Sequence, residues 1–353
     1  MGKIRLAIAG VGNCASSLIQ GIEYYKKPDT EKVGILFEDV GGYKVTDIEV
    51  VAAFDIDRNK VGKDLSEAIF VSPNNTEKLS DVSKFGVEVQ MGPVMDGAPE
   101  HLREFVDVGD DLKPVNVGQA LKEAKADVLL NLTPTGSYDA ARYYARQAIE
   151  IAKIAFINGI PELIVSDDEF EKLAVKNRVP IIGDDFKSQL GATILNRSIL
   201  ELFLRRGVRI DRVYQLNYAG NTDFVNLVFR GGSKHLTKKA ALTGLIPYEA
   251  DISTGFAIVT NQKDRKIARI EVEGRKWAGA PVRVSTELSV NDSADAAGVM
   301  VDMIRCAKVG LDRGIAGRLV SASAYYAKHP PIQYEDKEAL EMLKEFIAGR
   351  RER

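Results

Sequence analysis

The stretch Ile4-Arg-Leu-Ala-Ile-Ala-Gly-Val-Gly-Asn-Cys-Ala15 decides the fold. Its apolar first half predicts a strand, and its second half satisfies G-x-G-x-x-G/A, a pattern that is specific only where a strand precedes it and a helix follows. The next residues share one apolar helical face: Ala15, Leu18, Ile19 and Ile22. Glycines let the backbone approach a pyrophosphate at such a helix start. The stretch therefore predicts a dinucleotide-binding turn, with an ordinary tight turn as the alternative. Its candidate contacts are Gly10, Gly12, Asn13, Cys14 and Ala15.

The first half of the chain continues as strands alternating with helices. Short apolar runs rich in β-branched residues predict further strands at Ile48–Phe54, Asp127–Leu132, Ile154–Ile157 and Val179–Gly183. Helical patterns lie between them at Tyr138–Lys153 and Asp167–Lys176. This alternation predicts a Rossmann-like, doubly wound parallel sheet.

The second half has a different pattern. A helix at Ala192–Arg206, ended by Gly207, is followed by strand-like runs at Val213–Asn217, Ile267–Glu273 and Val282–Val290. These runs favour a mainly antiparallel layer. Helical patterns return at Ser293–Lys308 and Glu335–Arg353. We therefore predict an α/β fold with an inserted α+β catalytic and oligomerisation domain. The expected boundaries are 1–190 for the dinucleotide-binding domain, 191–292 for the inserted domain, and 293–353 for helices that return to the first domain.

Length and composition narrow the functional class. With 353 residues, 45% hydrophobic residues, 28% charged residues and a net charge of −2, the chain suits about two globular domains. There is no basic excess for nucleic acid. Two cysteines and three scattered histidines suggest neither a disulfide framework nor a zinc site. We expect no signal peptide and no membrane span, and hence a reducing cytoplasm.

An acidic residue should end the second strand and bind the adenosine ribose. Asp55 stands there, 45 positions after Gly10 instead of about 20, so Tyr24–Lys44 must form an inserted loop or hairpin. A carboxylate would repel the 2′-phosphate of NADP and so favour NAD, although Arg58 and Lys60 weaken that preference. An ordinary turn acid is the alternative.

Three more strand ends carry small polar groups, at Thr133–Ser137, Asn158–Pro161 and Gly183–Ser188. Ligands of open α/β sheets bind beyond the carboxyl ends of the strands, so these segments outline a cofactor cleft. Turn chemistry is the alternative, with Asp184 or Asp185 capping the following helix. The candidate contacts are Thr133, Gly159, Asp185, Lys187 and Ser188.

Several polar residues of the second half remain ambiguous when considered singly. Lys234 and Lys238 are four apart, so on a helix they would repel each other unless an anion such as phosphate lay between them. A solvated basic face is the alternative. Lys328 alone suggests a surface lysine, and Asp292-Ser293 suggests a helix N-cap.

Taken together and in order, these blocks resemble the signatures of myo-inositol-1-phosphate synthase, most closely its shorter prokaryotic members. The matching blocks are Gly183–Gln189, Asn217–Asn226, Ser233–Lys238, Asp292-Ser293 and Ala327–Pro330, and the resemblance covers nearly the whole chain. It implies NAD-dependent conversion of D-glucose 6-phosphate to 1D-myo-inositol 3-phosphate. C5 is oxidised, a C6 proton is lost, the enolate attacks C1, and the same NADH reduces C5 again.

The resemblance also assigns residues. It places Lys234, Lys238, Lys328, Asp223 and Asp185 in catalysis, with Lys238 or Lys328 handling the C5 hydroxyl proton and Lys234 stabilising the C1 oxyanion. Substrate contacts add Lys187, Ser188 and Asn221, and cofactor contacts add Asp292 and Ser293. It further implies a homotetramer. Family members differ in using a divalent or a monovalent cation, and the sequence offers no clear metal cage beyond Asp184 and Asp185.

One departure from the family pattern concerns a further lysine. The family pattern expects it within Ile270–Arg283, where Lys276 is nearest and Arg275 and Arg283 are the cationic substitutes. Two other functions remain open. One is an ordinary NAD-dependent dehydrogenase of a phosphorylated or semialdehyde substrate, and the other is an NAD-sensing relative without catalysis.

Overall fold

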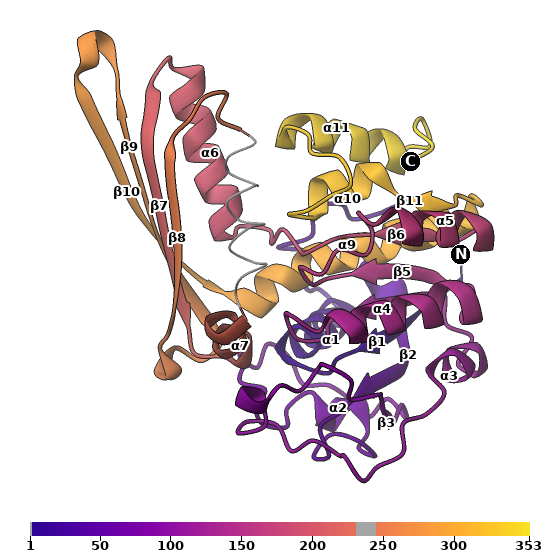
Figure 1. Cartoon of the computed structure of the whole chain (residues 1–353). Coiled ribbons are helices and arrows are strands. Elements are labelled where there is room, and N and C mark those ends of the chain that lie inside the picture. Colours follow the sequence, from indigo (N-terminus) through magenta and orange to yellow (C-terminus); the bar gives the residue numbers. More distant parts are fainter. Residues whose placement is uncertain (1, 231–244) are drawn as a thin grey trace.

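The computed structural model describes residues 2–230 and 245–353, whose strands form two sheets (Figure 1). The first sheet has the strand order β11-β6-β5-β4-β1-β2-β3. Its strands are β1 (Ile4–Ala9), β2 (Ile48–Asp55), β3 (Val89–Met91), β4 (Val128–Asn131), β5 (Ala155–Asn158), β6 (Pro180–Ile182) and β11 (Gly317–Arg318). All its strand pairs are parallel. The run from β3 to β6 has the order 3-2-1-4-5-6 of a dinucleotide-binding sheet, so the predicted fold class is confirmed.

Helices cover both faces of this sheet because alternate strand residues point to opposite sides. Ile4, Leu6 and Ile8 pack in one buried cluster with residues of α1 (Asn13–Lys26) and α9 (Asp292–Asp312). Ala7 and Ala9 face the other cluster, built with α3 (Val117–Glu123), α4 (Tyr138–Arg146) and α5 (Asp168–Asn177). Three further helices complete this part of the molecule: α2 (Leu65–Ala68), α10 (Val320–Tyr326) and α11 (Asp336–Ile347).

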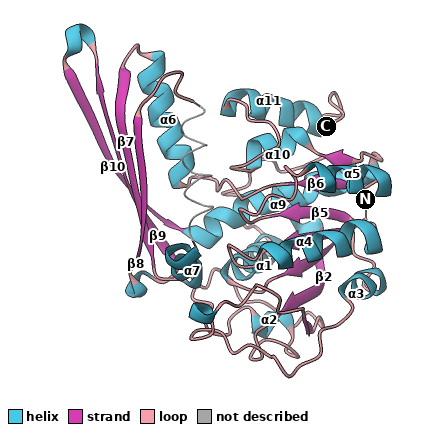
Figure 2. Cartoon of the chain, viewed as in Figure 1, coloured by secondary structure: helices cyan, strands magenta, loops and turns pink. Residues whose placement is uncertain are grey.

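The second sheet stands beside the first, with the order β10-β9-β7-β8 (Figure 2). Its long strands are β7 (Arg209–Ala219), β8 (Asp251–Ile258), β9 (Arg265–Arg275) and β10 (Pro281–Asn291). Strand β9 is antiparallel to β7 and β10, whereas β8 runs parallel to β7. Helix α6 (Ala192–Arg205) packs Leu200 and Phe203 on the inner face, and α7 (Thr222–Arg230) follows β7 at the end of the sheet nearest the first one (Figure 1).

Several predicted elements have other limits in the structure. The helix predicted at Tyr138–Lys153 is α-helical only to Arg146 and continues as a wider π-helical turn, Gln147–Ala152. The terminal helix ends at Ile347. In the predicted insertion, α1 runs to Lys26 and an irregular loop follows. Arg305 of α9 holds that loop by donating to the carbonyl oxygens of Phe37, Glu38 and Tyr43.

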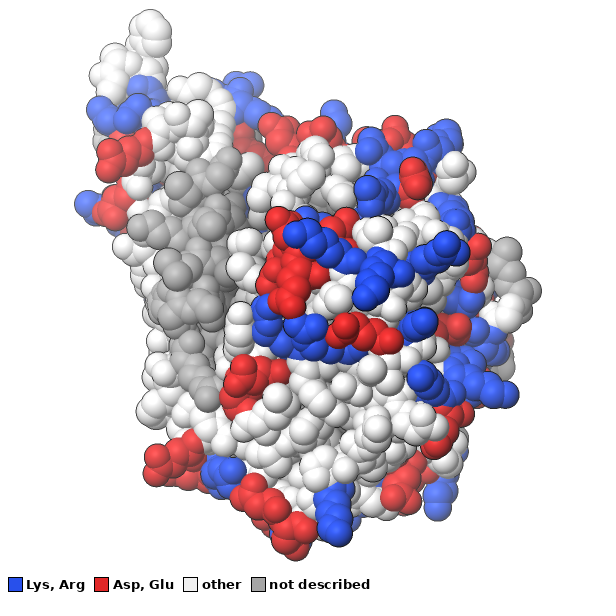
Figure 3. Space-filling view, turned by 45° about the vertical axis from the view of Figure 1, so that its right-hand side comes forward, with Lys and Arg blue, Asp and Glu red and all other residues white. Residues whose placement is uncertain are grey.

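Charge is mixed on the surface. On the face shown in Figure 3, basic and acidic side chains lie next to one another. Arg142, for example, contacts both Asp167 and Glu169 at 3.0 and 2.8 Å. Among the described residues, no helix has the length and apolar character needed to cross a membrane. The domain boundaries and the cytoplasmic location remain predictions.

Candidate functional site

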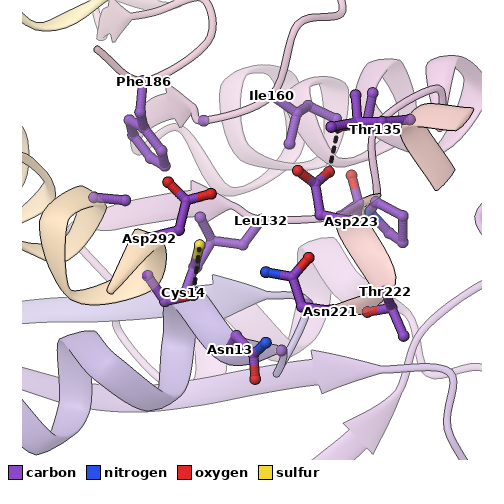
Figure 4. A pocket seen from close by; sticks show the side chains of 18 of the residues that line it. Asn13, Cys14, Leu132, Thr135, Ile160, Phe186, Asn221, Thr222, Asp223 and Asp292 are labelled. Carbon is purple, nitrogen blue, oxygen red and sulfur yellow. Dashed lines mark hydrogen bonds between the residues drawn. The ribbon is translucent and has the colours of Figure 1, made fainter. Parts of the chain in front are cut away.

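A cavity of about 280 Å³ lies at the carboxyl edge of the first sheet, where the second sheet and α9 approach it (Figure 4). Segments that follow β1, β2, β4, β5 and β6 all line it, as the sequence predicts. The predicted site residues found in its wall are Gly10, Gly12, Asn13, Cys14, Asp55, Thr133, Gly159, Asp185, Ser188, Asn221, Asp223, Asp292, Ser293 and Lys328. Lys234 and Lys238 lie outside the described residues.

The glycine-rich loop has the form that a dinucleotide requires. Gly10 has φ +95°, and a Cβ there would lie 2.5 Å from the carbonyl oxygen of Leu132. A Cβ on Gly12 would meet nothing within 4 Å, because this glycine faces the cavity where α1 begins. Ala15 was predicted to contact the cofactor, but it is fully buried against the sheet. Its small side chain allows close packing of helix and strand, which is the usual role of the third position in this motif.

Asp55 ends β2 and lines the cavity. Its carboxylate accepts hydrogen bonds from the backbone N–H groups of Val11, Ile56 and Asp57 at 2.7 to 2.9 Å. The two basic residues that weakened the NAD preference both have partners within the protein, although Lys60 also lines the cavity. Arg58 pairs with Asp107 and Asp111, and the ammonium group of Lys60 donates at 3.0 Å to the Val11 carbonyl oxygen.

The segment after β6 runs antiparallel to the segment after α10. Lys328 N–H donates to the Asp185 carbonyl oxygen at 2.7 Å, and Lys187 N–H donates to that of Tyr326 at 2.8 Å. This register places the side chains of Asp185 and Lys328 together, with 2.8 Å between Oδ1 and Nζ. Both are largely buried, at 5% and 14% side-chain exposure, and both line the cavity.

Asp184 has a structural role. It is fully buried and accepts hydrogen bonds from the N–H groups of Ile164, Val165 and Ser166 at 3.0 to 3.2 Å. It therefore fixes the turn after β5. The expectation that Asp184 or Asp185 caps the next helix is wrong, since α6 has Gly191 as its N-cap. The N-cap suggested at Asp292-Ser293 is also wrong by one residue. Asn291 is the N-cap of α9, and its side-chain oxygen accepts a hydrogen bond from the Ala294 N–H.

Lys187 does not line the cavity, which corrects its predicted role in substrate binding. Its ammonium group lies 2.7 Å from Oδ1 of Asp336 in α11. Arg197 of α6 contacts the other oxygen of Asp336 at 2.7 Å. Burial lowers the pKa of Lys187. Burial also acts to raise the pKa of Asp336, but the two cations hold it below its ordinary value.

A lysine that the sequence analysis did not name, Lys266, lines the cavity. It lies on β9 opposite Val290 of β10, and this register brings its ammonium group into an ion pair with Asp292. The substitutes proposed within Ile270–Arg283 are wrong. Lys276 is exposed beside the hairpin turn between β9 and β10, and the exposed Arg275 and Arg283 pair with Asp211 and Glu271.

The remaining wall comes from the start of α7. Asp223 accepts a hydrogen bond from the Thr135 hydroxyl at 2.9 Å, which links the second sheet to the loop after β4 (Figure 4). Burial and the neighbouring carboxylates Asp264 and Asp292 raise the pKa of the Cys14 thiol to about 12, so the thiol is neutral near pH 7. Within the described ranges, no cluster of three or more His, Cys, Asp or Glu side chains is arranged to hold a metal ion.

The fold and cavity define a Rossmann-type α/β protein whose polar site is completed by a second sheet. The sequence profile of myo-inositol-1-phosphate synthase matches residues 191–293. The chain is 46% identical to the inositol-3-phosphate synthase of Mycobacterium tuberculosis H37Rv, over 98% of this chain and 96% of that protein. The chain belongs to the myo-inositol-1-phosphate synthase family.

A second relative agrees with this assignment, and two solved structures share the fold. The inositol-3-phosphate synthase of Corynebacterium glutamicum is 45% identical over 98% of both chains. The crystal structure of Ari2 is 35% identical with a TM-score of 0.81 over 99% of both chains. A myo-inositol-1-phosphate synthase-related protein from Thermotoga maritima, 24% identical, shares the fold with a TM-score of 0.80 over 99% of both chains.

Proposed function

We propose that this protein is an inositol-3-phosphate synthase that converts D-glucose 6-phosphate to 1D-myo-inositol 3-phosphate and uses NAD as a recycled cofactor. The observation that carries the proposal is the placement of two ammonium groups. Lys328 and Lys266 come from separate parts of the chain, each pairs with a carboxylate, and both line the cavity that contains the glycine-rich loop. The names of full-length relatives at 46% and 45% identity support the same activity.

The cavity fits NAD on structural grounds. The open space at Gly12 and the start of α1 suit a pyrophosphate, and Asp55 stands where the adenosine ribose would lie. Arg58 and Lys60 are held by other partners, which favours NAD over NADP. Bound NAD would accept the C5 hydride and return it after ring closure.

The residues of this chain then bind the substrate and supply positive charge beside it. The reaction places negative charge on substrate oxygens in successive steps, and ammonium groups fixed beside those oxygens stabilise the transition states. In our proposal Lys328, oriented by Asp185, exchanges the proton of the C5 hydroxyl. Lys266, oriented by Asp292, lies beside the sugar phosphate, and Asp223 orients the substrate next to the nicotinamide. Lys234 and Lys238 keep their expected roles as predictions.

Phosphorus NMR of glucose 6-phosphate with protein and substoichiometric NAD tests the proposal. We expect an inositol phosphate signal to grow without accumulation of NADH. One NADH per turnover would indicate the dehydrogenase, and NAD binding without any change in the sugar phosphate would indicate the sensing relative. Parallel samples with EDTA, or with a monovalent salt replaced, determine whether a cation assists.

We also propose a homotetramer in which outer faces of the second sheet meet. Residues opposite one another in the strand register share this face: Tyr214, Leu216 and Tyr218 of β7, Ser253, Gly255 and Ala257 of β8, and Ile267, Arg269 and Glu271 of β9. Its apolar and aromatic members are Tyr214, Leu216, Tyr218, Ala257 and Ile267. None of the described helices lies over it (Figure 1). A second copy packed there would bury these apolar groups.

A further inference from the structure

Asp264 is a buried carboxylate outside the cavity wall that contacts three residues of the proposed site. It lies in the turn between β8 and β9 and is 1% exposed. Its Oδ1 accepts hydrogen bonds from the Asn13 amide at 3.2 Å, the Asn221 amide at 2.9 Å and the Ser293 hydroxyl at 2.9 Å. Its Oδ2 accepts one from the Ser293 N–H at 3.2 Å. Each of these groups donates its hydrogen bond to the Asp264 carboxylate.

These partners come from the starts of three helices. Asn13 is the first residue of α1, Asn221 directly precedes α7, and Ser293 is the second residue of α9. Figure 4 shows Asn13 and Asn221 on the same side of the cavity. Burial and the neighbouring Asp292 raise the pKa of the Asp264 carboxyl, and the hydrogen bonds from Asn221 and Ser293 oppose that shift. Asp264 thus joins the glycine-rich loop, the segment before Asp223, and α9.

The contacts of Asn13 show how this junction reaches the cofactor loop. The amide oxygen of Asn13 accepts from the N–H groups of Asn75 and Thr76 at 2.8 and 3.2 Å, while its amide nitrogen donates to Asn75 Oδ1 at 2.9 Å and to Asp264 Oδ1 at 3.2 Å. The side chain is therefore fixed at both ends. Removing the acceptor at Asp264 would leave Asn75 as the acceptor of this amide nitrogen, and the start of α1 would lose its link to the turn between β8 and β9.

We infer that Asp264 is a positioning residue that holds the dinucleotide loop, the Asn221 segment and α9 in the one arrangement that binds NAD and substrate together. The part of the inference that concerns the substrate rests on the proposed function, whereas the part that concerns NAD binding does not. It distinguishes Asp264 from a carboxylate that only stabilises the fold. Loss of its acceptor should weaken NAD binding and lower turnover, whereas loss of a purely structural carboxylate should lower only the melting temperature.

The inference is tested with Asp264→Asn in the full-length protein. This substitution keeps the size of the side chain but places an amide N–H group where the surrounding groups are hydrogen-bond donors. Asp64→Asn is the control, matched in the number of hydrogen bonds that the carboxylate accepts. Asp64 also accepts four hydrogen bonds, from Ser66 N–H, the Ser66 hydroxyl, Phe85 N–H and Gly86 N–H at 2.6 to 3.2 Å, and lies outside the cavity wall. NAD titration calorimetry, thermal melting, kcat and KM are measured on both.

We expect both variants to melt at lower temperature, while only Asp264→Asn raises the Kd for NAD, by about tenfold or more, and lowers kcat. NAD affinity and kcat equal to those of Asp64→Asn would overturn the inference. If Asp264→Asn does not fold, Asp264→Ser, which keeps a hydroxyl acceptor, is judged by the same readouts. A wild-type protein that binds NAD but forms no inositol phosphate would refute the proposed function and leave the NAD comparison valid.

Discussion

The two glycines of the dinucleotide loop serve different physical purposes. Gly10 is required by the fold, since any side chain would collide with the Leu132 carbonyl oxygen and its φ of +95° is strained for other residues. Gly12 has an ordinary φ of −91° and open space around it, so its missing side chain matters only to a ligand.

We therefore expect Gly12→Ala to leave the melting temperature unchanged and to raise the Kd for NAD by about tenfold or more, equivalent to ~1.4 kcal/mol. Gly10→Ala should instead destabilise the protein by about 1–3 kcal/mol through backbone strain and collision. Calorimetric NAD titration and thermal melting of both variants check this. Unchanged NAD affinity in Gly12→Ala would argue against the pyrophosphate position.

Lys266 is expected to stabilise the negative charge that develops on the substrate oxygens beside the sugar phosphate. Lys266→Ala should lower kcat by about a hundredfold or more, the usual effect of removing one preorganised donor. The control is Lys276→Ala, since Lys276 is exposed beside the hairpin turn and should leave kcat unchanged. Equal activity of the two variants in the phosphorus NMR assay would contradict the role of Lys266.

Sequence reasoning could not have named Lys266 or Asp264 for a simple physical reason. Lys266 meets Asp292 only through the register of β9 and β10, and nothing local to Lys266 reports that register. A lone aspartate such as Asp264 is indistinguishable from a turn residue. The glycine-rich loop, by contrast, was predicted because its function is encoded in contiguous residues.

The segment after β6 and helix α6 are joined to α11 by a largely buried ionic cluster of Lys187, Arg197 and Asp336. The exposed fractions of these side chains are 6%, 5% and 25%. Asp336 therefore holds Lys187 in place, and with it the segment after β6 that also carries Asp185. Without that carboxylate the two buried cations would lose the negative charge that they share, which is costly.

We expect Asp336→Asn to lower the free energy of unfolding by about 3–5 kcal/mol near pH 7. Because the folded-state pKa of Asp336 is lowered, its contribution is present above the unfolded value of about 3.9 and is lost as pH falls through the folded value. The difference between wild type and variant should therefore shrink below about pH 4. Urea unfolding at several pH values measures it.

The control for this experiment is Asp168→Asn, which removes the exposed partner of Arg318. Exposed pairs contribute about 0–1 kcal/mol, so this variant should unfold almost as wild type does. A loss equal to that of Asp336→Asn would show that burial is not the cause.

The elements themselves were predictable where the pattern was strong. Five strands of the first sheet, β1, β2, β4, β5 and β6, lie within two residues of the predicted limits because buried parallel strands form short apolar runs. Strands β3 and β11 have only three and two residues, too few for any periodic signal. Strand β8 was missed because Ser253, Thr254, Gly255 and Ala257 give it little apolar alternation.

The proposed assembly depends on the outer face of the second sheet. Tyr218→Arg would place a charge at the centre of the apolar group formed with Ala257 and Ile267. We expect this variant to dissociate from the tetramer, because burying an unpaired charge in an interface is unfavourable. Val33→Arg, at a side chain 62% exposed in the insertion loop, is the control and should remain tetrameric. Light scattering after size exclusion distinguishes the states, and a monomeric wild type would refute the proposal.

The late position of α9 and β11 in the chain has a consequence during synthesis. The first sheet lacks its last strand and the helix covering Ile4, Leu6 and Ile8 until residues 292–318 have been made. At roughly 5–20 residues per second, translation from residue 190 to residue 318 takes about 6–26 s. Throughout that time the nascent chain presents an open apolar face, to which chaperones can bind, and the first domain can close only when the ribosome has nearly finished.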